Sequence, residues 1–199
     1  TIQAYHLNHR TYFYCNDVYV GEVADWGTTY SDRIGIYSLR ATAKVYSVEV
    51  RGIAGEGPEK VIRARVNDEA VYSEKFTSYS TGKVLPNGWV NSGYSFLYNN
   101  TNAMNNLSYG VWNDSDSVRY LTYKSKGGGH IMTLPAVNSE DYVYTVKAKM
   151  GEYSSGAGIN KVGIVTNIAN DYSAAKSATI FEVQPADSKF KIYSRVSSG

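Results

Sequence analysis

Aromatic side chains that lie between the predicted strands are the residues of this sequence best suited to bind a ligand. Flat rings stack on the apolar face of a pyranose, while amide and carboxylate groups beside them bind its hydroxyl groups. The candidates are Trp26 and Tyr30 in ADWGTTYSD, Trp112 with Asn113 and Asp114 in YGVWNDSDS, Tyr153 in YSSG, and Tyr172 in NDYS. The sequence therefore predicts sugar binding by stacking on Trp26 or Trp112. The alternative is that these rings cover open edges of the fold.

Catalytic groups are less well supported by the sequence. Glycoside hydrolysis needs two carboxylates on opposite sides of the scissile bond. Glu140 and Asp141 are adjacent, so on a strand their side chains point to opposite faces. Glu182 shares a face with Ile180 on a predicted strand and could point inward. The single cysteine, Cys15, is predicted to be a small buried hydrophobe, because nothing in the sequence orients a histidine beside it. We therefore expect no catalytic residue.

Composition excludes several classes of function. The 199 residues include 20 Lys and Arg against 18 Asp and Glu, a net charge of +2, which provides no overall basic field for nucleic acid. One cysteine excludes an internal disulfide and a multi-cysteine zinc site, and three histidines, of which only His6 and His9 are near each other in sequence, argue against a histidine metal centre. Apolar runs are only a few residues long, far below the ~18 needed for membrane insertion.

Alternation of apolar and polar residues predicts the elements that must position these side chains. In YVYTVKAKM, Tyr142, Tyr144 and Val146 share one face, opposite Val143 and Lys147, as in a half-buried strand. Gly and Asn turn signals separate the segments, and no helical stripe is convincing. The pattern predicts an all-β antiparallel sandwich of the jelly-roll kind. Strands are expected at 10–15, 18–24, 33–38, 42–50, 60–66, 70–76, 117–124, 142–150, 161–167, 177–184 and 189–196.

Two stretches of the chain resemble the concanavalin A-like, or laminin-G-like, jelly-roll superfamily. Its closing strands are similar to Tyr12–Val50, which reads YFYCNDVYVGEVADWGTTYSDRIGIYSLRATAKVYSVEV. Its opening strand and the "lP.gW" motif that follows are similar to Val71–Val90, which reads VYSEKFTSYSTGKVLPNGWV. The resemblance implies that Trp89 lies in the core. It also implies a carbohydrate-binding module within a larger secreted or surface-anchored bacterial protein, and therefore an extracellular or cell-surface location.

The resemblance places the closing strands before the opening strands. Residues 1–53 correspond to the closing segment, 54–69 to a linker or exposed loop, and 70–199 to the opening and middle strands. One circularly permuted domain is the favoured arrangement, because an open sandwich would expose strand edges and core. The alternatives are parts of two tandem domains, or completion by a neighbouring chain as a swapped or head-to-tail assembly.

The predicted partner is a polysaccharide or other glycan, with no nucleic acid, no membrane insertion and no cofactor. In the resembling family an Asp of the last strand helps to bind a structural calcium ion, and Tyr46-Ser47 stand at that place here. Asp17, Asp25, Asp32 and Glu74 remain as weak calcium candidates. Two alternatives to a carbohydrate-binding module stay open: a structural spacer or adhesin module that makes protein contacts, and, ranked lowest, a glycoside-acting enzyme domain.

Overall fold

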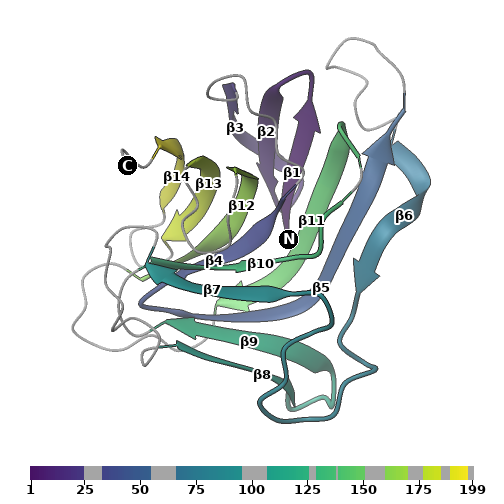
Figure 1. The fold of residues 1–199 in the computed structure, drawn as a ribbon, viewed down its shortest axis with the longest axis vertical. Coiled ribbons are helices and arrows are strands. Elements are labelled where there is room, and N and C mark those ends of the chain that lie inside the picture. The colour runs from purple at the N-terminus through teal and green to yellow at the C-terminus, as the bar shows by residue number, and fades with distance from the viewer. Residues whose placement is uncertain are drawn as a thin grey trace.

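The computed structural model describes residues 1–24, 33–54, 66–95, 107–125, 129–137, 139–150, 160–169, 177–184 and 189–196. These residues form two antiparallel sheets that pack face to face (Figure 1). The first sheet runs in the order β3 (Val18–Ala24), β2 (Arg10–Cys15), β1 (Ile2–Leu7), β11 (Tyr142–Met150), β5 (Thr42–Ile53), β9 (Arg119–Ser125) and β8 (Leu107–Asn113), and β6 (Val66–Glu74) pairs with β5. The second runs in the order β14 (Lys189–Val196), β13 (Ser177–Gln184), β12 (Lys161–Ala169), β4 (Gly35–Leu39), β10 (Gly129–Thr133) and β7 (Val90–Ser95). The predicted all-β sandwich is confirmed.

Strands from the start of the chain lie inside both sheets. β1 pairs with β11, and β5 lies between β11 on one edge and β9 and β6 on the other. In the second sheet β4 lies between β10 and β12. β9 shares the edge of β5 with β6 because β5 is twelve residues long, so its first residues pair with β9 and its later ones with β6. Residues 1–53 and the later strands thus contribute to the same two sheets.

Four strands were not predicted from the alternation pattern: β1, β7, β8 and β10. In β1 the pattern fails because both faces are buried: Ala4 packs between the sheets, whereas Tyr5 and Leu7 pack in a separate cluster on the outer face. In β8 the sequence LSYGVWN contains Gly and Asn, which read as turn residues. β6 begins at Val66, so the end of the predicted 54–69 linker is strand, while 55–65 lies outside the described residues.

The main core fills the space between the sheets. Phe13 and Phe181 stack across it with ring centroids 5.2 Å apart, and Phe190 extends the stack at 5.7 Å from Phe181. Tyr142 and Tyr144 are fully buried, as their face of the strand predicts. Trp89 is also a core residue, and its indole Nε1–H donates to the hydroxyl of Tyr72 at 2.5 Å.

Tyrosine accounts for much of the buried aromatic surface, because the phenol ring packs as a hydrophobe. The Tyr144 hydroxyl keeps a polar partner and donates to the carbonyl oxygen of Gly35 at 3.2 Å. Burial raises the pKa of Tyr144 and of Tyr123 well above 10. Burial also raises the pKa of Tyr72, to about 12. The fold therefore holds several phenols that resist ionisation.

We expect the free energy of unfolding to fall as the pH rises above the ordinary tyrosine pKa of about 10. Below that pH these tyrosines are protonated in both states and contribute no pH dependence. Above it the unfolded chain releases protons that the folded chain retains, and each such phenol then lowers stability by about 1.4 kcal/mol per pH unit. Urea unfolding at about pH 8 and about pH 11 measures the change. Equal urea midpoints at the two pH values would contradict this account.

Candidate functional site

Of the predicted ligand-binding residues, the structure describes three, and these are consecutive in the chain. Trp112 and Asn113 are the last two residues of β8, and Asp114 begins the turn to β9. Trp112 was expected to lie in a loop just before a strand; the structure places it within a strand instead. Trp26, Tyr30, Tyr153 and Tyr172 lie outside the described residues, as do the calcium candidates Asp25 and Asp32.

Trp112 lies on the outer face of the eight-stranded sheet, pointing away from the core. Its neighbour Val111 is fully buried, whereas 47% of Trp112 is exposed. The indole extends along β8 over Gly110, where a Cβ atom would lie 3.0 Å from the indole Nε1. The same Cβ would also overlap the carbonyl oxygen of Gly82, which bridges to β8 at Val111. Glycine at position 110 therefore leaves room for the indole to lie along the strand.

Three residues that the sequence did not single out complete the surface around Trp112. Tyr120 of β9 is the direct cross-strand partner of Trp112. The rings of Tyr120 and Tyr46 have centroids 5.8 Å apart, and Lys44 Nζ lies 5.2 Å from the Tyr120 ring centroid. We call Trp112, Tyr120, Tyr46 and Lys44 the Trp112 surface. Lys44, Tyr46 and Tyr120 alternate with buried Ala43, Val45 and Leu121, so they face outward. The sequence does not show, however, that β5, β9 and β8 are neighbours.

Asp114 holds this end of the sheet in shape. Its Oδ1 accepts hydrogen bonds from the backbone N–H groups of Asp116 at 3.0 Å and Val118 at 2.8 Å. Burial, followed by the nearby Asp114 carboxylate, raises the pKa of Tyr46. Asp114 thus fixes the β8–β9 turn, and its charge lies near one ring of the Trp112 surface. Whether it also binds sugar hydroxyls stays a prediction.

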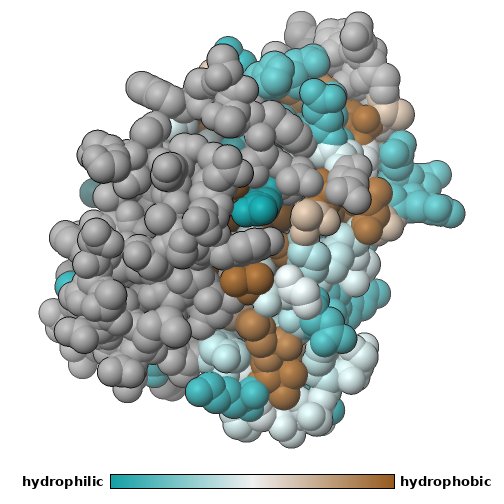
Figure 2. Space-filling view, viewed as in Figure 1, coloured by the Kyte–Doolittle hydropathy of each residue, from teal (hydrophilic) through white to brown (hydrophobic). Residues whose placement is uncertain are grey.

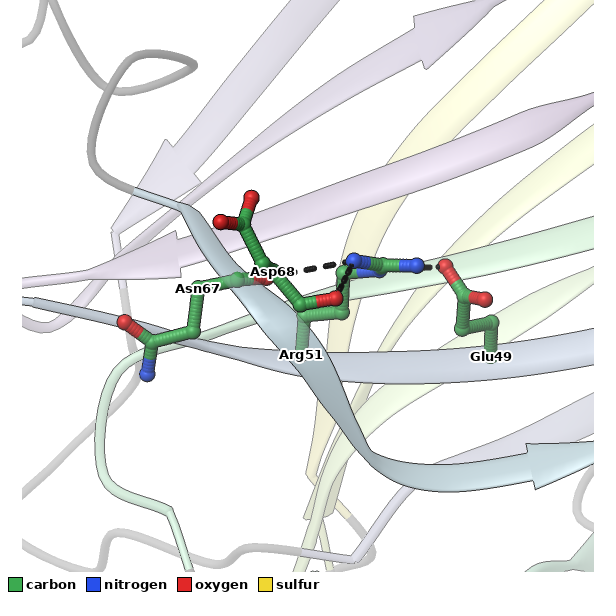
Figure 3. A network of polar contacts seen from close by, with 4 residues as sticks. All are labelled: Glu49, Arg51, Asn67 and Asp68. Atoms are coloured by element: carbon green, nitrogen blue, oxygen red, sulfur yellow. Dashed lines mark hydrogen bonds and ion pairs between the residues drawn. The ribbon is translucent and has the colours of Figure 1, made fainter.

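A second network of polar contacts holds β6 against the same sheet (Figure 3). Arg51 Nε donates to Glu49 Oε1 at 2.6 Å, and its NH1 donates to the carbonyl oxygens of Asn67 and Asp68. The pairing of β5 and β6 shifts register on both sides of Arg51, so backbone carbonyls there leave the regular ladder. The guanidinium supplies donors to those carbonyls. The hydrogen bond between the two side chains lowers the pKa of Glu49 and raises that of Arg51.

The described calcium candidates do not converge. Asp17 is exposed in the β2–β3 turn. Glu74 accepts hydrogen bonds from the backbone N–H of Phe76 at 2.6 Å and from the Tyr79 hydroxyl at 3.2 Å. Within the part of the chain that the structure describes, no three His, Cys, Asp or Glu residues are grouped closely enough to hold a metal ion. Cys15 is half-buried and packs against the main core.

Glu182 is fully buried on the outer face of the six-stranded sheet. Its Oε1 accepts from Lys161 Nζ at 2.5 Å and from Gln184 Nε2 at 2.8 Å, and its Oε2 accepts from the Tyr193 hydroxyl at 3.1 Å. It shares this face with buried Ile180, as predicted. Burial raises the pKa of Tyr193, and the neighbouring Tyr37 and Glu182 raise it further. Glu182 is already paired with the ammonium group of Lys161, whereas glycoside hydrolysis uses two carboxylates on opposite sides of the scissile bond.

The surface seen in Figure 2 is mainly hydrophilic in its described part, with small separate groups of hydrophobic residues. The described residues contain no helix long and apolar enough to cross a membrane. A comparison of the chain with protein-family models finds no match, and a comparison with curated proteins finds none either. The function must therefore be inferred from the residues of the sandwich themselves.

Proposed function

We propose that this chain is a non-catalytic carbohydrate-binding module of a larger secreted or cell-surface protein, and that it binds polysaccharide on the Trp112 surface. The observation that carries the proposal is the half-exposed indole of Trp112 on an outward sheet face. Tyr120 is its neighbour on β9, and Tyr46 lies on β5, on the other side of β9. Exposed aromatic rings on a rigid scaffold bind apolar ligand faces without ordering a flexible loop first. The resemblance to concanavalin A-like domains supports the same proposal.

The Trp112 surface is fixed in place by contacts that a merely exposed side chain would not need. Gly110 makes room for the indole, and Asp114 holds the turn that follows Trp112 by accepting two backbone hydrogen bonds. Because the rings lie on neighbouring strands about 4.8 Å apart, they extend across the sheet and not along one strand. An extended sugar chain laid across β8, β9 and β5 would stack on Trp112 and reach Tyr46, whereas Tyr120 is only 9% exposed and supports the two rings from below.

The test is retention on polysaccharide affinity gels. Wild-type protein is expected to be retarded by at least one polysaccharide of a broad panel, and Trp112→Ala is expected to remove the retardation. Tyr19→Ala is a matched control, because Tyr19 is 50% exposed and lies on the same outer face, on strand β3 at the opposite edge of the sheet. Loss of retention in both variants, or in neither, would contradict the proposal.

The second candidate function is a spacer or adhesin module that contacts protein. It is favoured by the position of β8 at the end of the sheet order, where the part of the strand edge that Gly82 does not bridge at Val111 can pair with another chain. Retention by no polysaccharide, together with a dimer in size-exclusion chromatography, would favour this second candidate. A glycoside-acting enzyme ranks lower. Sugar release by the wild-type protein that is absent in Glu182→Gln would establish it instead.

A further inference from the structure

We infer that the Trp112 surface selects an acidic polysaccharide, one that carries carboxylate or sulfate groups. This inference rests on the proposed function and narrows its substrate class. It comes from the lysines that the strand register places around the aromatic rings. The lysines that share the outer face of the sheet at this end are Lys44 on β5, Lys124 on β9, and Lys147 and Lys149 on β11.

The register brings three of these lysines next to the rings. Lys44 lies over the Tyr120 ring, and its cross-strand partner on β11 is Lys149. Lys147 is paired with Ser47, the residue after Tyr46. All three point outward, because Val45, Val146 and Ala148 between them pack into the core. A ligand that crosses from Trp112 to β11, over a span of about 14 Å at the usual strand spacing, meets aromatic rings first and ammonium groups next.

The fourth lysine, Lys124, lies further from Trp112 along β9. It pairs with Ser108 of β8 and Thr42 of β5, and buried Tyr123 on its inward side shows that it faces outward. The basic groups therefore border the rings on two sides.

Few carboxylates lie on this part of the face, and most of those already have a hydrogen-bond or ion-pair partner. Among the described residues the carboxylates near the rings are Asp114 and Asp116, and Asp114 already accepts hydrogen bonds from two backbone N–H groups. Glu49, further along β5, is paired with Arg51. The four ammonium groups thus leave a local excess of positive charge, although the whole chain carries only +2.

This arrangement fits a polysaccharide whose sugars stack on the rings while its acidic groups reach the lysines. Lysine is a strongly hydrated point charge on a flexible stem, so it suits repeated anionic groups without fixing their exact position. Each exposed charge contact contributes little, and salt screens it. Selectivity for an acidic chain would therefore be clear at low ionic strength and weaker at high ionic strength.

The experiment compares one backbone with and without its charge. Polygalacturonate supplies carboxylates, its highly methyl-esterified form supplies the same sugars without them, and dextran sulfate supplies sulfate esters. Binding is measured by isothermal titration at low and high salt, with wild type, Trp112→Ala and the triple variant Lys44→Gln/Lys147→Gln/Lys149→Gln. We expect polygalacturonate or dextran sulfate to bind more tightly than the methyl ester, and the triple variant to lose about tenfold in that affinity.

The outcomes separate this inference from the proposed function. Equal binding of charged and esterified polymer, lost in Trp112→Ala, would overturn the inference and leave the proposed function standing. Binding of acidic polymer that survives in Trp112→Ala, or that the triple variant retains unchanged, would also overturn it. Tighter binding of a single-stranded oligonucleotide, in competition with the polysaccharide, would overturn it in favour of nucleic acid. Retention by no neutral or acidic polysaccharide would count against the proposed function itself.

Discussion

Gly163→Ala is expected to destabilise the protein by at least about 3 kcal/mol, enough to prevent stable folding. Gly163 lies in β12, between Glu182 of β13 and Tyr37 of β4. A Cβ atom there would overlap the carbonyl oxygen of Phe181, and would lie 2.9 Å from the Phe181 carbonyl carbon and 3.0 Å from Glu182 Cα. All three are backbone atoms in a paired strand, so no side chain can rotate away. β12 and β13 would have to separate.

Urea unfolding followed by tryptophan fluorescence measures the change. Gly21→Ala is the control, because the added methyl would meet only the terminal Cδ1 of Ile192, at 2.9 Å, which can move. We expect a small shift in midpoint for Gly21→Ala and a large shift, or no folded protein, for Gly163→Ala. A Gly163→Ala protein with the wild-type midpoint would show that β12 and β13 do not approach as closely as described.

Glu182→Leu is expected to cost about 3–5 kcal/mol, because it leaves a nearly buried ammonium group without its counterion. The side chain of Lys161 is only 12% exposed, and that of Glu182 is fully buried. The substitution changes volume little but also removes the acceptor for Gln184 and Tyr193. Loss of a buried charge partner is far more harmful than loss of an exposed one.

The double variant Glu182→Leu/Lys161→Met separates charge from packing. Replacing both members of a buried ion pair with apolar side chains is often close to neutral, so we expect it to recover most of the stability lost in the single variant. Thermal or urea unfolding of the three proteins measures the effect. A single variant as stable as wild type, or a double variant no better than the single, would contradict the role assigned to the pair.

Local alternation was sufficient to predict many of the strands but not how they are paired. The segment YVYTVKAKM follows a clean period of two and forms β11 with the predicted faces. Trp112 is half-exposed and lies outside the core, and Gly110 and Asn113 make its strand resemble a loop in the sequence. Tyr120 could not be joined to Trp112 because β8, the strand that pairs with β9, was not predicted. Tyr46 and Lys44 could not be joined to it because β5 reaches β9 only through a pairing of segments about 75 residues apart, as between Val45 and Leu121. Such long-range pairing is set by packing of the whole sandwich and not by any local pattern.

The central claim is that the Trp112 surface binds a polysaccharide, and isothermal titration with the polysaccharide that best retains the wild-type protein tests it most directly. The proteins compared are wild type, Trp112→Ala, Trp112→Phe and Tyr19→Ala, each first shown to keep the wild-type urea midpoint. We predict that Trp112→Ala weakens binding by at least about tenfold, as for an aromatic anchor, that Trp112→Phe retains part of the affinity, and that Tyr19→Ala binds as wild type. Equal affinity of Trp112→Ala and wild type would contradict the claim.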